Sequence, residues 1–316
     1  MPKSAGYEPT VFGLILNWNN AQETMEAVKS LLDDGRADQI VIIDNGSTDD
    51  SVSRLREKFI NYSSIEFILN DKNIGFAAGM NVGIRHSIEN GATHVLLLND
   101  DAEITEGSVN TMLQAFDEHD KVGIVGPRIC YYQNKSDVWH GGGRINMLTG
   151  SVDNPERGKS VDELSKDSRN VGFLTGCVML LSVEMIKDIG MLDQSMTFYY
   201  EDMDICHRAI VEGYKIRFVP EAVAYHKISP SSAARVSAFA MYHLAKSRLI
   251  FISKFHSSVY LLYGLLLQVF VYTPYRLKQI MCGNGDTRAF FCWLQGTYDG
   301  AIAGIRRQSG YRNEQR

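Results

Sequence analysis

The sequence lacks both of the glycine-rich motifs with which nucleotide-binding proteins most often hold phosphate. It contains no GxxxxGK[ST] pattern, and no GxGxxG pattern follows an apolar run. These absences exclude a P-loop and an ordinary dinucleotide-binding fingerprint. If the chain binds a nucleotide, other groups must hold the phosphates.

Cysteine and proline are also scarce. The 316 residues include five cysteines, with neither a CxxC pair nor a zinc-ligand spacing, and seven prolines. Such cysteines are typical of reduced thiols, so we expect a cytoplasmic protein without disulfides. Residues 1–10 form an N-terminal extension without the apolar stretch of a signal peptide, so export by that route is not expected. Hydrophobic residues make up 45% of the chain, enough to bury a core over most of its length.

Charge is unevenly distributed along the chain. The formal net charge is -5, but residues 235–316 carry 11 Lys/Arg and 3 Asp/Glu, a local charge of +8, which leaves -13 for the residues before them. This asymmetry indicates two surfaces with different partners. A basic region could face anionic lipid or nucleic acid, whereas an acidic body repels phosphate unless a cation lies between them.

Short apolar runs alternate with helical patterns in the first third of the chain. The runs, each expected to be a strand, are 11–16, 39–43, 65–69 and 95–98. This alternation predicts an α/β fold with a mostly parallel sheet flanked by helices. Polar clusters directly follow three of the runs, at 17–20, 44–50 and 99–101. Ligands of such sheets bind beyond the carboxyl ends of the strands, so these clusters predict a binding site.

Asn99-Asp100-Asp101 is the most acidic of these strand ends. Adjacent carboxylates repel each other unless solvent or a cation screens them. One interpretation is an exposed acidic turn. The other is a site where a hard divalent cation joins a carboxylate to a diphosphate, since Mg²⁺ and Mn²⁺ favour oxygen ligands.

A second acidic motif, Glu201-Asp202-Met203-Asp204, follows three aromatic residues and begins an amphipathic helix. Acidic residues in a first helical turn are ordinary partners of the helix dipole. Alternatively, one carboxylate is a general base that the aromatic residues partly desolvate. His226, at the end of another expected strand, is either a hydrogen-bonded core histidine or a metal ligand.

Three glycines at intervals of four residues, Gly75, Gly79 and Gly83, follow Asn73 and would form one bare stripe on a helix. Close packing of helix and sheet explains such a stripe. The alternative is functional: Asn73 and Gly75 at the helix start would let a ribose or a phosphate approach the backbone amides.

Seven short motifs follow one another within residues 11–230. They are LILNWN at 14–19, VIIDNGSTD at 41–49, NIGFAAGMN at 73–81, LLLNDD at 96–101, FLTGC at 173–177, FYYEDMD at 198–204 and YH at 225–226. In this order they resemble glycosyltransferase family 2, which has the GT-A fold, and within it the rhamnosyltransferase-like group. Each motif is short, and the resemblance is specific because all seven recur in sequence.

The resemblance implies a role for individual residues of this chain. Asp202 would be the catalytic base, and Asp101 and His226 would hold a Mn²⁺ or Mg²⁺ ion. The nucleotide-sugar site would contain Asn17, Asp44, Asn45, Asn73, Gly75, Asn81, Asn99 and Asp100. The acceptor or the active-site loops would be oriented by Trp139, His140, Gly176, Glu201 and Asp204. Asn99 departs from the acidic residue of the family's DxD motif and is a weaker metal ligand, although asparagine is usual there in the rhamnosyltransferase-like group.

The implied activity is inverting, metal-dependent transfer of a sugar to a hydroxyl of a polysaccharide or a lipid-linked glycan. The resemblance favours rhamnose from dTDP-rhamnose as the donor. A UDP-sugar transferase of the same fold, using galactose, glucose or N-acetylhexosamine, and a non-catalytic glycan- or membrane-binding scaffold remain alternatives. A nucleotidyltransferase would need a basic residue over the α-phosphate, and no Lys or Arg stands beside 99–101.

The expected domains are a GT-A catalytic domain, 11–232, and a basic, apolar helical C-terminal region, 233–316. The catalytic domain would comprise a nucleotide-binding half, 11–110, and an acceptor half, 111–232. In the C-terminal region the apolar run Tyr260–Thr273 contains one glutamine and is shorter than the roughly 20 residues of a membrane span. It could be a helix buried against the catalytic domain or a partner subunit, an interfacial helix or a true span. We expect peripheral contact with the cytoplasmic face of a membrane and no nucleic-acid partner; a homo-oligomer stays an open alternative.

Overall fold

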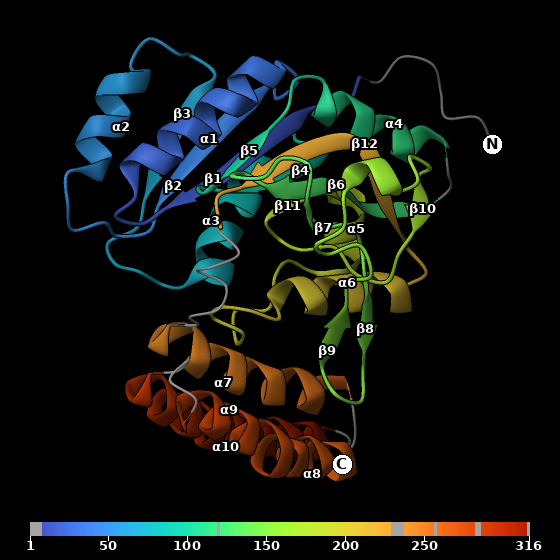
Figure 1. The fold of residues 1–316 in the computed structure, drawn as a ribbon. Coiled ribbons are helices and arrows are strands. Elements are labelled where there is room, and N and C mark those ends of the chain that lie inside the picture. Colours follow the sequence, from blue (N-terminus) through green and yellow to red (C-terminus); the bar gives the residue numbers. More distant parts are fainter. Residues whose placement is uncertain (1–7, 119–120, 229–236, 256–257, 282–285, 315–316) are drawn as a thin grey trace.

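The computed structural model describes residues 8–118, 121–228, 237–255, 258–281 and 286–314, and Figure 1 shows its ribbon. The first elements are β1 (Val11–Asn17), α1 (Ala21–Asp34), β2 (Gln39–Asp44), α2 (Ser51–Phe59), β3 (Ile65–Leu69), α3 (Phe76–Glu89), β4 (His94–Asn99), β5 (Ala102–Ile104) and α4 (Ser108–Glu118). They are followed by β6 (Val122–Tyr131), β7 (Val138–His140), β8 (Arg144–Asn146), β9 (Ser151–Asp153), a 3-10 turn (Val161–Glu163), β10 (Arg169–Asn170), β11 (Val178–Ser182), α5 (Val183–Ile189), α6 (Glu201–Val211) and β12 (Lys215–His226). The C-terminal elements are α7 (Ala238–Phe255), α8 (Ser258–Leu267), the π-helical segment η2 (Gln268–Tyr272), α9 (Thr273–Met281) and α10 (Thr287–Glu314).

The first four strands form the parallel half of one sheet. The strand order along the sheet is β10-β12-β6-β11-β4-β1-β2-β3, and β1 pairs in parallel with both β2 and β4. Residues 17, 44 and 99 therefore end three neighbouring strands at the same edge, as the sequence predicts. Beyond β4 the sheet is mixed, because β11 runs antiparallel to both β4 and β6. The predicted α/β fold with helices on both faces is confirmed.

Alternating side chains of the strands divide the core into two layers. Leu14, Leu16 and Val41 face the layer made by α3, α5 and α6, whereas Ile15 and Ile42 face the layer made by α1, α2 and α4. Ordinary packing explains part of the glycine stripe on α3: a Cβ at Gly79 or Gly83 would lie within 3 Å of side chains on β1 and β2.

The C-terminal helices α7 to α10 lie together below the sheet in Figure 1, and α7 packs against the core layer that contains α6. Ile250, Phe251 and Ile252 of α7 belong to the same buried cluster as α3, α5 and α6. A Cβ at Gly296 or Gly300 of α10 would lie 2.2 Å or 2.7 Å from a backbone oxygen of α7, so the bare stripe on α10 permits close contact between the two helices. The C-terminal helices are thus continuous with the core of the catalytic part.

Two predicted domain boundaries fall largely outside the described residues. The junction at 232/233 lies within 229–236, and residues 1–7 of the predicted N-terminal extension are also outside. Within the described residues, one helical stretch, Ser258–Lys278, is long and apolar enough to cross a membrane by length and composition alone, and most of it is not buried inside the protein. The division into domains remains a prediction.

Candidate active site

A pocket of about 380 Å³ opens where the carboxyl ends of β1, β2 and β4 approach the start of α6. Ten of the sixteen residues predicted from the motifs line it: Asn45, Asn73, Asn99, Asp100, Asp101, Trp139, Gly176, Glu201, Asp202 and His226. The remaining six, Asn17, Asp44, Gly75, Asn81, His140 and Asp204, lie outside its lining. The structure therefore brings the proposed metal ligands, base and part of the nucleotide-sugar site into one cavity.

Asp44 and Asn17 form a buried polar pair behind the pocket wall. Asp44 Oδ1 accepts hydrogen bonds from Asn17 Nδ2 at 2.7 Å and from Ser47 Oγ at 2.6 Å, and its Oδ2 accepts from the Ser47 N–H at 2.9 Å. Thr24 Oγ1 donates to Asn17 Oδ1 at 2.8 Å. These bonds fix the loop that carries Asn45 into the pocket.

The turn before α3 reaches from the nucleotide side of the pocket to the α6 side. Asn45 Nδ2 donates to Asn73 Oδ1 at 3.2 Å, and the Phe76 N–H donates to the Thr197 carbonyl at 3.0 Å. Gly75 has a φ of 88°, and a Cβ there would lie 2.3 Å from Thr197 Cγ2. Glycine is therefore required by both the backbone conformation and the close approach, which gives Gly75 a structural role beside the pocket.

Asp101 and His226 meet at the end of β4 and β12. His226 Nε2 lies 3.1 Å from Asp101 Oδ1, whereas Asp100 accepts a hydrogen bond from Asn20 at 2.9 Å. Burial, and then repulsion by Asp101, raises the pKa of Asp100 to about 7. Burial of the His226 ring opposes its charged form, but Cys177 and the Asp101 carboxylate outweigh this and raise the pKa of His226 to about 10.

The donor atoms here fit a divalent cation that a diphosphate would share. Asn99 Oδ1 is buried without a hydrogen-bond partner, and the contact of His226 Nε2 with Asp101 Oδ1 joins two groups that a dication can hold once the imidazole gives up its proton. Within the described ranges, no group of three or more His, Cys, Asp or Glu side chains could hold a metal ion unaided. Mg²⁺ typically uses one or two carboxylates and completes its shell with substrate phosphates and water, so a pair of protein ligands is compatible with it.

Asp202 lines the same pocket from the first turn of α6. Its Oδ2 accepts a hydrogen bond from the Gly176 N–H at 3.1 Å, and its Oδ1 accepts one from the Met203 N–H at 2.8 Å. Burial raises the pKa of Asp202 although these N–H groups favour its ionised form. Burial and the neighbouring Asp202 charge raise the pKa of Glu201 well above its usual range, and Glu201 Oε2 is buried without a hydrogen-bond partner.

The chain enters α6 through a constrained backbone. Tyr199 and Tyr200 both have positive φ, at 62° and 74°. Tyr200 is held by a 2.9 Å hydrogen bond from its hydroxyl to the Gly150 carbonyl. Two consecutive non-glycine residues in this region are unusual, and such strain persists only where the surroundings enforce it. The constraint aims Glu201 and Asp202 into the pocket.

Three predicted residues outside the pocket have structural contacts instead. Asn81 exchanges two hydrogen bonds with the backbone of Leu192, Asp204 lies in an ion network, and His140 packs its ring against Phe173. Burial lowers the pKa of His140 to about 3, so this ring is neutral. The position of a residue in a motif therefore does not tell whether its side chain lines the pocket or supports the surrounding structure.

Eight further residues line the pocket without having been assigned a site role from the sequence. Seven of them stand inside the quoted motifs, and Ile228 lies outside them: Leu16, Trp18, Phe76, Thr175, Cys177, Phe198, Tyr199 and Ile228. Trp18 is 49% exposed and Tyr199 40% exposed. Their aromatic faces suit the apolar faces of a base or a sugar ring. The sequence signal for them is their place within the motifs, since Trp18 belongs to the motif at 14–19 and Tyr199 to the motif at 198–204.

The fold is that of the GT-A glycosyltransferases. The structure resembles GalNAc-T7 with UDP, GalNAc and Mn²⁺, with a TM-score of 0.60 and 13% identity over 86% of this chain and 57% of that chain. It also resembles the mannosyltransferase PcManGT from Pyrobaculum calidifontis in complex with GDP-Man and Mn²⁺, with a TM-score of 0.55 and 14% identity over 96% of this chain and 87% of that one. At these identities the likeness establishes the fold alone.

The chain belongs to glycosyl transferase family 2, whose family model matches residues 14–190, more than half of the sequence. It is 29% identical to the low-salt glycan biosynthesis hexosyltransferase Agl10 of Haloferax volcanii over 56% of this chain and 55% of that protein, so it spans about half of that relative. It is 20% identical to the dTDP-rhamnosyl transferase RfbF of Shigella flexneri, over 70% of both chains. It is 25% identical to the N-acetylglucosaminyl-diphospho-decaprenol L-rhamnosyltransferase of Mycobacterium tuberculosis, over 69% of this chain and 75% of that one. The predicted family is confirmed, and rhamnosyltransferases are among its relatives.

Proposed function

We propose that this glycosyltransferase inverts the anomeric centre of a nucleoside-diphosphate sugar in one displacement onto an acceptor hydroxyl. The observation that carries the proposal is the shared pocket: Asp101 and His226 lie on one wall, and Asp202 lies on the α6 wall. This arrangement suits a diphosphate at the first wall and an acceptor beside the base. Among the residues that line the pocket, Asp202 is the carboxylate that we assign to proton removal.

Each group in the pocket has a distinct task in this mechanism. Asp202 takes the proton of the attacking hydroxyl, while the Gly176 N–H keeps the carboxylate aimed at it. Asp101 and His226 would hold the Mn²⁺ or Mg²⁺ ion that, when bound, neutralises the departing diphosphate. Asn45 and Asn73 would contact the base or the ribose, with Asp44 and Asn17 fixing their loops. The aromatic residues restrict water around the reacting carbon.

Rhamnose from dTDP-rhamnose is the donor that we propose, with a polysaccharide or a lipid-linked glycan as the acceptor. Two of the relatives support it by name, one as a dTDP-rhamnosyl transferase and one as an L-rhamnosyltransferase acting on a diphospho-decaprenol. The hexosyltransferase relative supports a hexose as the alternative donor sugar, for which we consider UDP-hexoses. The reaction would take place at the cytoplasmic face of a membrane, which the chain would contact peripherally.

A donor panel tests the proposed function. The purified chain is incubated with dTDP-rhamnose, UDP-galactose, UDP-glucose or UDP-N-acetylglucosamine, each with a lipid-diphosphate acceptor and Mn²⁺, and nucleoside diphosphate release is measured. We expect release with dTDP-rhamnose at least about tenfold faster than with any UDP-sugar, since a mismatched base and sugar together forfeit more than about 1.4 kcal/mol. A UDP-sugar preference would overturn the donor assignment. Absence of turnover with every donor and acceptor would favour a binding scaffold.

A further inference from the structure

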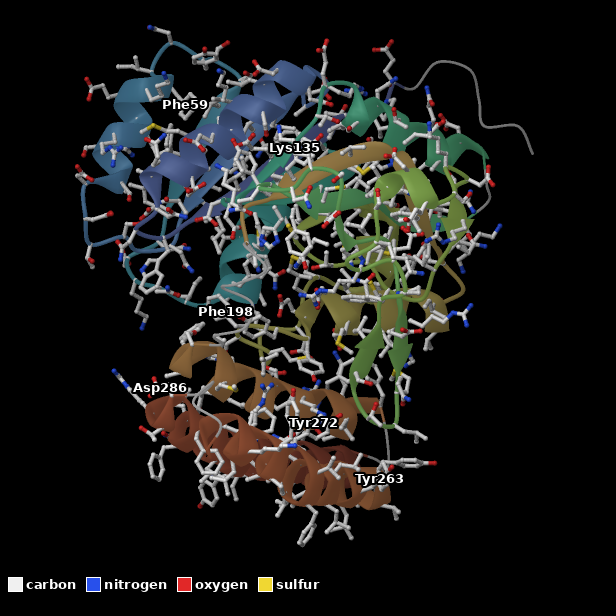
Figure 2. The ribbon with its side chains drawn as sticks, in the orientation of Figure 1. Phe59, Lys135, Phe198, Tyr263, Tyr272 and Asp286 are labelled. Carbon is white, nitrogen blue, oxygen red and sulfur yellow. The ribbon has the colours of Figure 1, made fainter. Side chains whose placement is uncertain are left out.

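The C-terminal helices expose large apolar side chains on their outer surface and bury a polar side chain inside. In the helical stretch 258–278, Gln268 is fully buried, and its Nε2 donates at 3.0 Å to both the Ala245 carbonyl and Thr297 Oγ1. Large apolar side chains of α8, η2 and α10 are instead exposed: Val259, Leu262, Tyr263, Leu266, Val269, Phe270, Val271, Phe291, Leu294 and Tyr298. Figure 2 shows Tyr263 at the margin of these helices, where its side chain projects outward from them. A polar interior with an apolar exterior is the reverse of a water-exposed helix.

We propose that this surface, which we call the apolar face, docks on an anionic lipid bilayer and lies within its interface. This inference deepens the proposed function by naming the surface that meets the membrane. Exposed Lys278, Arg288 and Arg306 accompany the apolar side chains, and residues 235–316 have a local charge of +8. Basic side chains beside a broad apolar surface are typical of interfacial helices on anionic lipid.

The charge also argues against a second copy as the occupant. A two-fold dimer through this face would bring the exposed Lys278, Arg288 and Arg306 of two copies together, and these like charges repel. Crossing the bilayer is disfavoured as well, because Gln268 holds the stretch against α7 and α10 through its partners in both helices. The face can therefore enter the headgroup region while these contacts stay intact.

Flotation with vesicles tests the docking surface. We compare phosphatidylcholine vesicles with and without phosphatidylglycerol, using the full chain and the triple variant Leu262→Gln/Phe270→Gln/Phe291→Gln. The control is Ile60→Gln/Val211→Gln. Both residues are exposed and apolar, but Ile60 directly follows α2 and Val211 ends α6, so neither belongs to the apolar face. We expect flotation of the wild type and the control with anionic vesicles, and at least about a tenfold loss of bound fraction in the triple variant.

Each other outcome overturns the proposal. Wild type that stays unbound excludes a bilayer partner. A lipid-free dimer that the triple variant abolishes would make a second copy the occupant, and resistance to alkaline extraction would indicate a span. Turnover with a water-soluble acceptor is measured in parallel, so that failure to dock is distinguished from failure of the proposed transferase activity.

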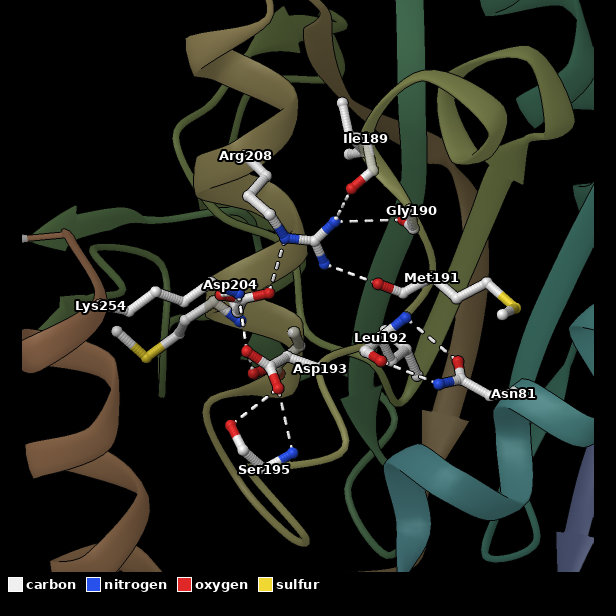
Figure 3. A network of polar contacts seen from close by, with 12 residues as sticks. Asn81, Ile189, Gly190, Met191, Leu192, Asp193, Ser195, Asp204, Arg208 and Lys254 are labelled. Atoms are coloured by element: carbon white, nitrogen blue, oxygen red, sulfur yellow. Dashed lines mark hydrogen bonds and ion pairs between the residues drawn. The ribbon is translucent and has the colours of Figure 1, made fainter. Parts of the chain in front are cut away.

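A second observation concerns the inner side of the same helices, where Lys254 of α7 forms ion pairs with carboxylates of the catalytic part. Lys254 Nζ lies 2.5 Å from Asp204 Oδ1 and 2.7 Å from Asp193 Oδ2. Figure 3 shows the three residues together in the network that they share with Arg208. The Asp204 side chain is fully buried, and that of Lys254 is 17% exposed. A buried ion pair brings little net stability but is costly to break from one side.

The two carboxylates that Lys254 contacts, Asp204 and Asp193, belong to the two segments on either side of Asp202: the first turns of α6 and the chain that precedes it. Asp204 stands one position beyond Met203 in α6, two residues after Asp202, and also accepts a hydrogen bond from Arg208 Nε at 2.7 Å. Arg208 in turn donates to the carbonyls of the segment before Asp193: Ile189, Gly190 and Met191. Asp193 precedes the constrained turn at 199–200. Lys254 thus joins the start of α6 to the segment that aims it.

We infer that Lys254 is a positioning residue for Asp202, an inference that rests on the proposed function. Without its ammonium group, Asp204 and Asp193 would lose the cation that they share and repel each other across the start of α6. A displacement of about 1 Å at a reacting group can cost about 10²-fold in rate. The C-terminal helices would then be part of the catalytic unit as well as a membrane contact.

The test compares Lys254→Met and Lys254→Arg in the full chain with a water-soluble acceptor. We expect Lys254→Met to lower kcat about 30- to 100-fold while the donor KM stays within about twofold, and Lys254→Arg to retain most of kcat. Arg307→Met is the matched control, because Arg307 reaches Asp193 at 3.2 Å from a more exposed position. The double variant Lys254→Met/Asp204→Asn removes one of the two carboxylates that Lys254 bridges, so their repulsion is lost and part of kcat should be recovered.

The pH dependence of kcat separates positioning from folding. Asp202 is faced by Glu201 and Asp204 on its own helix, by the Thr175–Gly176 loop, and by the neutral Tyr200 and Cys206. Without Lys254, Asp204 keeps Arg208 as its cation but loses the second one, so its negative charge disfavours the ionised base more strongly. The acidic limb of Lys254→Met should therefore move to higher pH. A variant with reduced thermal stability but unchanged kcat and acidic limb would overturn the inference. An inactive wild type would instead count against the proposed function.

Discussion

Asp202→Asn should abolish sugar transfer while nucleotide binding persists. Loss of a general base lowers kcat by about 10²–10⁴-fold, and the amide is close in size to the carboxylate. The side chain of Asp202 accepts hydrogen bonds from Gly176 and Met203, not from the nucleotide-side loops. We therefore expect the affinity for the nucleoside diphosphate to stay within about twofold, measured by calorimetry beside single-turnover kinetics.

The pH dependence of wild-type kcat is a second test of the assignment of Asp202 as the general base. Because burial raises the pKa of Asp202, its proton-accepting form is lost at a higher pH than for an exposed aspartate. Activity should be present above this raised pKa and should fall as the pH drops through it. Glu212→Gln, at the exposed end of α6, is the control and should leave the acidic limb unchanged. Normal turnover by Asp202→Asn would show that another group removes the proton.

The strand ends explain why much of this site could be predicted from the sequence. Asn17, Asp44 and Asn99 each follow an apolar run, and the parallel pairing of β1 with β2 and β4 forces these ends together. That step needs only hydrophobic periodicity and the topology of parallel sheets. The placement of Asp202 and His226 in the same site could be predicted only from the family resemblance. Hydrophobic periodicity shows that a helix starts at one and a strand ends at the other, but it does not show that either lies near Asp101.

Contacts between distant segments could not be predicted in this way. Asn81 belongs to a family motif, yet its amide bonds to Leu192, 111 residues further on. Gln268 interrupts an apolar run in the sequence, where it suggests a weak membrane segment, but it faces inward to Ala245 and Thr297. In the sequence, nothing distinguishes Lys254 from the other basic residues of the C-terminal region. Only the structure shows that it pairs with Asp204. In each case the partner is set by tertiary packing, which local pattern does not encode.

Removal of the divalent cation is expected to have an effect comparable to removal of the base. The pocket has an acidic wall at Asp100 and Asp101, which repels a diphosphate of two to three negative charges unless a cation intervenes. A metal ion at a developing phosphate charge stabilises the transition state by several kcal/mol, or about 10²–10³-fold in rate. With EDTA, turnover should therefore fall by at least about 10²-fold and return on titration with Mn²⁺.

Asp101→Asn should reproduce this loss because it removes the carboxylate that lies 3.1 Å from His226 Nε2. Nucleoside diphosphate binding should also lose its dependence on Mn²⁺, which calorimetry measures without turnover. Asp100→Asn provides the matched comparison in the same turn: its carboxylate accepts from Asn20, so an amide at this position should cost less. Equal losses in the two variants would place the cation between both aspartates and not beside His226. Full activity of Asp101→Asn in EDTA would instead mean that protein dipoles and hydrogen bonds alone stabilise the departing diphosphate.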